Sequence, residues 1–274
     1  MTEPGLLVCG AGRPGKVIPS RTVGVIGGMG PLATAAFFRE IVRATKAATD
    51  QDHLHVIVDS DSSIPDRTGF LLGAGPDPRP ALIASARRLR AAGCELLAMP
   101  CNTAHAFGAE IRAAVDVPLL DWIAITADAI AAAGRAPVGL LATRGTLRVG
   151  LYQRALAARG VESVVPRSSE ALAVMAAIYG REGVKGGAAS ERSQRLLLRV
   201  ARQLVERGAR RLILACTELP LAVPSSDPRW PVPAVDPAVL NARELVRLAG
   251  GRLAPMTGSY QQVDTRPADA ISSG

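Results

Sequence analysis

The chain has 274 residues, of which 48% are hydrophobic and 20% are charged, and its formal net charge is +8. This composition predicts a globular protein of one large domain or two smaller ones, and no apolar run approaches the roughly 18 residues that span a membrane. The positive charge favours a small anionic partner, and we expect neither nucleic acid nor a membrane as a partner, because no nucleic-acid-binding motif or secretory signal accompanies it.

Strand and helix patterns alternate along the first half of the chain. Residues 1–20 show no periodicity and are expected to form a flexible tail. Beyond them, short apolar runs bounded by turn residues predict strands near 23–27, 55–60, 95–100 and 117–121. Apolar residues at helical spacing predict helices near 32–48 and 79–92.

The second half shows the same alternation. Strands are predicted near 138–142, 161–166, 211–216 and 232–236, and helices near 146–159, 170–179 and 188–207. Residues 253–274 lack periodicity and are expected to form a second flexible tail. Short apolar strands that alternate with helices are typical of parallel sheets covered on both faces.

The two halves match each other at an offset of 115 residues. Four matches share this register: 23–26 with 138–141, 89–93 with 204–208, Cys101 with Cys216, and 117–121 with 232–236. The repeat predicts an α/β protein of two similar lobes related by a pseudo-twofold. Each lobe is expected to hold a roughly four-stranded parallel sheet flanked by helices, with the active site in the interlobe cleft. The lobes are assigned to residues 21–121 and 122–228.

Two of the four cysteines follow predicted strands directly. Cys101 and Cys216 therefore lie where open parallel sheets bind ligands, at the carboxyl ends of the strands. A lone buried cysteine is usually inert, but two at equivalent positions of a duplicated fold can face each other across the cleft. One thiolate can then remove a proton from a carbon while the opposite thiol delivers another, which inverts the stereocentre without a cofactor.

The number and spacing of the cysteines also indicate the cellular compartment. The cysteines are too few for a disulfide framework and form no CxxC pair, so we expect no metal site and a reducing, cytoplasmic location. Cys9 lies in the first predicted tail and is expected to have no role.

Four motifs give the chain a resemblance to the aspartate/glutamate racemase family, on its aspartate racemase side. They occur in the family's order between about residues 22 and 250: Gly27-Gly28-Met29-Gly30-Pro31-Leu32-Ala33-Thr34, Ile64-Pro65-Asp66-Arg67-Thr68, Met99-Pro100-Cys101-Asn102-Thr103-Ala104-His105 and Cys216-Thr217-Glu218. The resemblance implies two lobes, the first completed by about residues 229–252, and racemisation of aspartate, possibly glutamate, without pyridoxal phosphate or another cofactor. It also implies a homodimer.

The resemblance assigns a role to each matching residue. Cys101 and Cys216 are the expected acid/base pair, and Arg67 and Lys185 resemble the cations that bind substrate carboxylates. The other residues expected to bind substrate are Met29, Gly30, Asn102, Thr103, Ala104, Thr143, Thr146 and Thr217. His105 and Glu218 are expected to support the thiols, with ordinary helix roles as the alternative for each.

Other functions compete with this interpretation. Hydantoin racemases, maleate isomerases and arylmalonate decarboxylases use related cysteine scaffolds, but their substrates do not require a pair like Arg67 and Lys185. The segment 28–33 also fits a dinucleotide-binding turn, although Pro31 removes a backbone donor from it and the duplicated cysteines remain unexplained. A non-catalytic amino-acid-binding protein is the third alternative, and it is less simple because both cysteines are present.

Two departures from the family pattern concern charge. Asp61 stands where an asparagine is expected, near Asp59, and extra negative charge there would disfavour an acidic substrate. Glu218 stands where glutamate racemases carry histidine, which favours the aspartate type.

Overall fold

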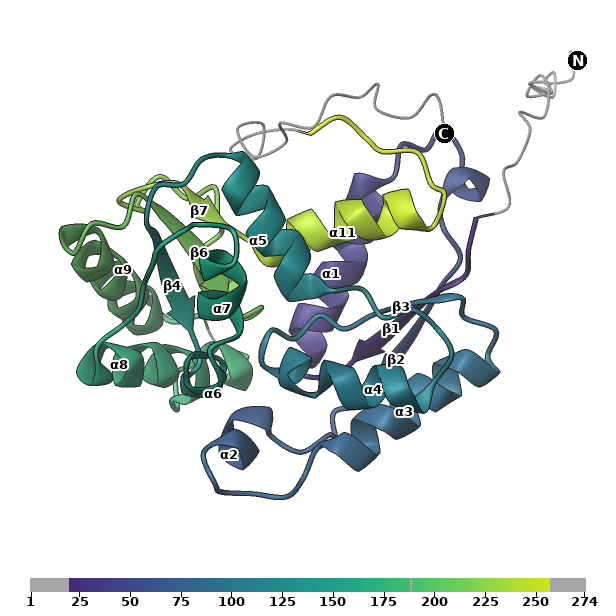
Figure 1. The fold of residues 1–274 in the computed structure, drawn as a ribbon, viewed down its shortest axis with the longest axis horizontal. Helices are drawn as coiled ribbons and strands as arrows, with labels where there is room; N and C mark the ends of the chain where they lie inside the picture. The colour runs from purple at the N-terminus through teal and green to yellow at the C-terminus, as the bar shows by residue number, and fades with distance from the viewer. Residues whose placement is uncertain (1–19, 188, 257–274) are drawn as a thin grey trace, which may run out of the picture.

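The computed structural model describes residues 20–187 and 189–256, which form two α/β lobes side by side (Figure 1). Cys9, and both predicted tails apart from Ser20 and residues 253–256, lie outside the described residues. Within residues 253–256, Leu253 forms an isolated antiparallel bridge with Thr45.

The first lobe carries three strands and four helices before the chain crosses to the second, counted over the described residues. They are β1 (Val23–Gly27), α1 (Pro31–Ala44), β2 (Val56–Ser60), α2 (Arg67–Leu71), α3 (Arg79–Ala91), β3 (Leu96–Ala98) and α4 (Gly108–Ala114). Short 3-10 turns occupy Asp50–Asp52 and Thr103–Phe107. The strands pair in parallel in the order β2-β1-β3.

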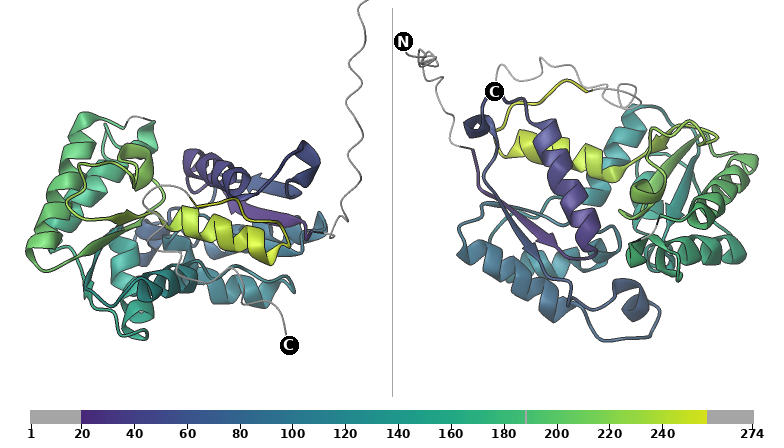
Figure 2. Two further views of the ribbon diagram at one scale, coloured as in Figure 1. Left: turned by 90° about the horizontal axis from the view of Figure 1, so that it is seen from above. Right: turned by 180° about the vertical axis from the view of Figure 1, so that it is seen from behind.

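The second lobe repeats this plan with one more strand. It contains α5 (Trp122–Ala132), β4 (Val138–Ala142), α6 (Arg144–Val149), α7 (Leu151–Ala157), β5 (Ser163–Val164), α8 (Ser168–Tyr179), the 3-10 turn Val184–Gly186, α9 (Glu191–Glu206), β6 (Arg211–Ala215), α10 (Leu219–Ala222) and β7 (Ala234–Val235). Its four strands are parallel in the order β5-β4-β6-β7. The chain then forms α11 (Pro237–Leu248), which packs on α1 and α5 (Figure 2).

The internal repeat is reproduced in the strand register. Leu97 bridges Leu119 in the first lobe, and Leu212 pairs with Ala234 in the second, again 115 residues later. Asp121 caps α5 and Asp236 caps α11, each by accepting a hydrogen bond from a backbone N–H with its side-chain carboxylate. The predicted fold class, two similar α/β lobes with parallel sheets, is therefore confirmed.

Two predicted elements differ in detail. The predicted strand at 117–121 contributes only the single bridge at Leu119, between Pro118, which offers no backbone N–H, and Asp121, which caps the next helix. The predicted helix at 146–159 is broken into α6 and α7 at Gly150, whose φ of 69° is a left-handed conformation that ends a helix.

One apolar cluster links the two lobes. It includes Val25 of β1, Leu140 of β4 and Leu245 of α11, all essentially without solvent exposure. Phe37 of α1 packs against Trp122 of α5 with ring centroids 5.2 Å apart. This shared core fixes how the carboxyl ends of the two sheets face each other. No helix in the described part of the chain is long and apolar enough to cross a membrane.

Candidate active site

Cys101 and Cys216 line one small cavity between the lobes. Cys216 directly follows β6, and Cys101 lies three residues after the last residue of β3. The cavity has a volume of about 10 Å³, room for about one water molecule, and its walls are Met29, Arg67, Thr68, Cys101, Asn102, Thr103, Thr143, Tyr179, Lys185, Cys216, Thr217 and Glu218. The structure thus brings together most of the residues that the sequence singled out, from both halves of the chain.

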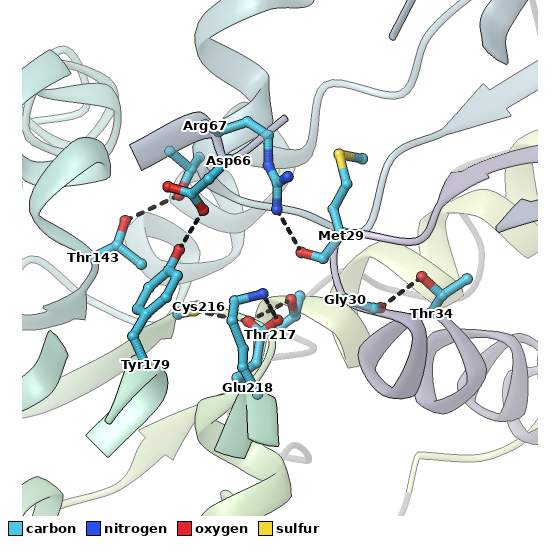
Figure 3. Close-up of polar contacts among 12 residues, drawn as sticks. Met29, Gly30, Thr34, Asp66, Arg67, Thr143, Tyr179, Cys216, Thr217 and Glu218 are labelled. Atoms are coloured by element: carbon cyan, nitrogen blue, oxygen red, sulfur yellow. Dashed lines mark hydrogen bonds and ion pairs between the residues drawn. The ribbon is translucent and has the colours of Figure 1, made fainter. Parts of the chain in front are cut away.

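Arg67 places a cation beside Cys101. Asp66 caps the first turn of α2, and Arg67 begins that helix with 6% of its surface exposed. The guanidinium donates to the backbone carbonyls of Ile64 and Pro65 at 3.1 and 2.9 Å and to that of Met29 at 3.2 Å, the last of which is drawn in Figure 3. Burial lowers the pKa of Arg67, but its electrostatic interactions with Cys101 and Asp66 more than offset this, so the pKa is raised.

Glu218 places a carboxylate beside Cys216. The Cys216 Sγ donates to Glu218 Oε2 at 2.9 Å, and the Lys185 Nζ donates to Oε1 of the same carboxylate at 2.7 Å (Figure 3). Burial and the charge of Glu218 raise the pKa of the Cys216 thiol well above its usual value. Burial lowers the pKa of Lys185, but the ion pair with Glu218 outweighs it, and the pKa is raised. Cys216 is therefore held as a thiol at neutral pH.

Asn102 is held in one orientation by two aromatic side chains. Its Oδ1 accepts from Tyr152 Oη at 2.6 Å and from Trp122 Nε1 at 3.1 Å. These bonds point Nδ2 away from both rings, and Nδ2 is buried with no hydrogen-bond partner among the described residues. A buried donor without a partner is uncommon in native proteins and marks a place for an acceptor, such as a substrate oxygen.

Threonine hydroxyls join the two lobes at the floor of the cavity. Thr103 Oγ1 lies 3.0 Å from Thr143 Oγ1 and 2.9 Å from Thr146 Oγ1, which belong to the start of α6. Thr217 Oγ1 donates to the Pro100 carbonyl at 3.4 Å. These predicted substrate-binding residues therefore contact one another across the interface in the described state.

Four predicted residues do not line the small cavity, and one of them is Thr146, which bonds to Thr103 of the wall. Gly30 lines a larger neighbouring pocket and is not part of the wall of the small cavity, and Ala104 is completely buried behind that wall. His105 Nε2 bonds the Met99 carbonyl at 3.0 Å, and its ring stacks on Trp122. Burial lowers the pKa of His105 to about 4, so the ring is neutral.

Tyr179 is a site residue that the sequence did not reveal. It ends α8 in the second lobe, yet its hydroxyl donates to Asp66 Oδ2 of the first lobe at 2.9 Å (Figure 3). Lys185 Nζ lies 5.5 Å from the centre of its ring. The two residues are 113 positions apart, so their contact depends on the tertiary fold and cannot be predicted from a local sequence motif.

The two aspartates near the site, Asp59 and Asp61, both pair with one arginine. Arg88 of α3 pairs with Asp59 at 2.7 Å and with Asp61 at 3.0 Å. Neither aspartate lines the small cavity or its larger neighbour. Arg88 therefore offsets one of the two negative charges, and both aspartates lie outside the cavity.

The chain is similar to a family of racemases over most of its length. Residues 26–245 match the model of the Asp/Glu/hydantoin racemase family. The chain is also 30% identical over 149 residues to the broad specificity amino-acid racemase RacX of Bacillus subtilis, a match that covers 52% of this chain and 63% of that protein. The match thus spans less than two thirds of the length of this curated relative.

Solved structures resemble the protein across both lobes. An aspartate racemase of Picrophilus torridus is 28% identical with a TM-score of 0.76, and the match covers 89% of this chain and 99% of that chain. An aspartate racemase homologue from Pyrococcus horikoshii OT3 is 26% identical with a TM-score of 0.66, and that match covers 84% and 99% of the two chains.

Proposed function

The chain belongs to the Asp/Glu/hydantoin racemase family, and from this premise we propose that it interconverts the enantiomers of an amino acid, with aspartate as a substrate. One observation carries the proposal: two thiols from equivalent positions of the two lobes line the same cavity, and their neighbours have opposite charge. Such a pair has the parts for proton removal on one face of a carbon and proton delivery on the other.

The neighbours assign the two thiols their roles in one direction. Cys101 lines the cavity with Arg67 and is the residue that takes the α-proton in this scheme. Cys216, protonated beside Glu218, then donates its proton to the opposite face of the α-carbon. The roles exchange in the reverse direction, and atoms balance because one proton is taken and one is given. No step in this scheme requires a cofactor.

Cations and donors on the cavity wall can receive the α-carboxylate of an amino-acid substrate. Arg67 and Lys185 lie on the cavity wall, and Asn102 Nδ2 is a free donor there for a carboxylate oxygen. The negative charge that develops on the carbanion is stabilised by such preorganised groups. Aspartate fits this set, and the likeness to an aspartate racemase of Picrophilus torridus supports it.

Isotope exchange in D2O tests the proposal. With no pyridoxal phosphate added, L-aspartate is expected to lose its α-proton and to yield D-aspartate, as read by NMR and chiral chromatography. Cys101→Ser and Cys216→Ser are each expected to abolish racemisation while leaving exchange with one enantiomer. Cys94→Ser is the matched control, because Cys94 is also buried and free but lies outside the cavity.

The outcomes separate the competing functions. Full racemisation in either active-site variant would contradict the two-thiol mechanism. If the protein exchanges no amino acid but exchanges hydantoins, or releases CO2 from an arylmalonate, it has another activity of the same scaffold. The homodimer remains a prediction, for which light scattering of the purified protein is the measurement.

A further inference from the structure

The pocket next to the thiols is larger than the side chain of aspartate requires. Its volume is about 280 Å³, whereas a cavity of roughly 150 Å³ already holds a benzene molecule. It shares Met29, Arg67, Lys185 and Glu218 with the small cavity that contains Cys101. A side chain attached to a carbon between the thiols therefore has this pocket as its neighbouring space.

Most polar atoms of the charged groups in this pocket have partners, although Arg67 Nε is buried without one. Lys185 is paired with Glu218 at 2.7 Å, and the terminal nitrogens of Arg67 donate to three backbone carbonyls. Asp66 accepts from Tyr179. Among the described residues that line the pocket, two cations thus stand against two carboxylates, and the ligand's side chain meets a wall with no excess of either charge.

The rest of the wall is mostly apolar. It is formed by Met29, Pro31, Leu32, Ala33, Ile64, Val184 and Leu221. Leu32, in the first turn of α1, has 56% of its surface exposed at the edge of this pocket. Exposed apolar residues that border a concavity are typical of ligand-binding grooves.

We propose that this pocket is a side-chain subsite for uncharged, largely apolar amino acids longer than aspartate, of the kind represented by norvaline, leucine and methionine. The inference rests on the proposed two-thiol racemisation, which would act on these substrates in addition to aspartate. Burial of each further methylene is worth about 0.8 kcal/mol, so kcat/KM rises about fourfold per methylene. A side chain with a charge at its end gains less, because the ion pairs of the pocket are already satisfied.

A homologous substrate series tests the subsite. Rates of α-deuterium incorporation in D2O are measured for L-alanine, L-2-aminobutyrate, L-norvaline and L-methionine, with L-aspartate, L-glutamate and L-lysine alongside. We expect kcat/KM to rise along the uncharged series and methionine to exceed both glutamate and lysine.

A matched pair of variants locates the effect. Leu32→Asp brings a charge to the edge of the pocket and is expected to lower the methionine-to-alanine ratio of kcat/KM about tenfold. Leu172→Asp is the control, because Leu172 is 55% exposed on α8 and lies outside both cavities. It is expected to leave the ratio unchanged.

Each contrary result has a distinct meaning. If aspartate is racemised while norvaline and methionine exchange no faster than alanine, the subsite is overturned and the proposed function stands. Lysine as the best substrate overturns it as well, because the carboxylates of the pocket would then decide specificity. A folded, reduced protein that exchanges no amino acid overturns both proposals.

Discussion

The two lobes present equivalent cysteines on equivalent strands, yet they give them opposite surroundings. Cys101 lies beside the guanidinium of Arg67, and Cys216 lies beside the carboxylate of Glu218. At the offset of the repeat, Glu218 corresponds to Thr103, which bonds only hydroxyls of the second lobe. Duplication of the fold thus supplies two equivalent cysteines, and Arg67 beside one and Glu218 beside the other make them chemically different.

Of the variants considered, Glu218→Gln is expected to reduce the difference between Cys101 and Cys216 the most. The amide removes the negative charge that helps to raise the pKa of Cys216, so that pKa falls while the contribution of burial remains. A thiol that acts as the acid is lost as pH rises through its pKa, and the alkaline limb of the pH–rate profile therefore moves to lower pH. We expect kcat/KM to fall mainly at alkaline pH, by about tenfold for each pH unit that the limb moves.

Glu218→Asp is the matched variant for this experiment. It retains a carboxylate near Cys216 and is expected to restore part of the alkaline limb. A limb that stays in place, or moves to higher pH, in Glu218→Gln would show that the carboxylate does not hold the proton on Cys216.

Two equivalent glycines sharpen the comparison sterically. A Cβ on Gly145 would lie 2.9 Å from the backbone Cα of Thr68 in the opposite lobe, whereas a Cβ on Gly30 would meet only Glu218 Oε1 at 3.3 Å and Lys185 Nζ at 3.6 Å. Backbone cannot move aside as flexible side-chain ends can. Gly145→Ala is therefore expected to lower the free energy of unfolding by about 2 kcal/mol, and Gly30→Ala by less than about 1 kcal/mol.

Urea unfolding of the two variants provides the measurement. Equal losses would mean that the contact between Gly145 and Thr68 does not constrain how the lobes meet. A loss at Gly30 larger than that at Gly145 would place the tighter constraint on the side of Glu218.

The sequence predicted the repeated frame well because its signals are local. Strand ends, glycine turns and capping aspartates recur at one offset, and the pairing of Leu97 with Leu119 and of Leu212 with Ala234 follows that register. The helices α5 and α11 were not predicted. In α5 several faces are buried, since Trp122, Ala127 and Ile130 all lie inside, and the pattern of one apolar stripe is therefore absent from it.

The site divides along the same line. Cys101, Asn102 and Cys216 could be predicted as site residues because they follow strands in recognisable motifs. The contacts that tune them could not, because they join distant segments: Tyr152 reaches Asn102 across 50 positions, and Tyr179 reaches Asp66 across 113. Such pairs depend on how elements pack, and the pattern of one segment does not encode them.

Tyr179→Phe removes the hydroxyl that crosses between the lobes beside Arg67. Its ring is 38% exposed, so the stability of the fold is expected to change by less than about 0.5 kcal/mol. The bond to Asp66 helps to hold the first turn of α2, and with it Arg67. We expect KM to rise about tenfold with kcat reduced much less, as measured by steady-state kinetics. A fall in kcat alone would assign the hydroxyl to the proton transfers.

Tyr152→Phe makes the same change at a fully buried position beside Asn102 and is expected to have the smallest effect on activity. Burial raises the pKa of Tyr152, so its hydroxyl stays protonated and donates to Asn102 Oδ1. Without it, Oδ1 keeps the bond from Trp122, and the loss is about 1 kcal/mol, or about 2–4 °C in Tm. Thermal unfolding measures this loss. Because Trp122 still holds the amide, kcat/KM should change only about twofold. A change in kcat/KM as large as that of Tyr179→Phe would mean that Tyr152 alone orients Asn102. The site residue next to Cys101 would then depend on a tyrosine of the second lobe as strongly as Arg67 depends on Tyr179.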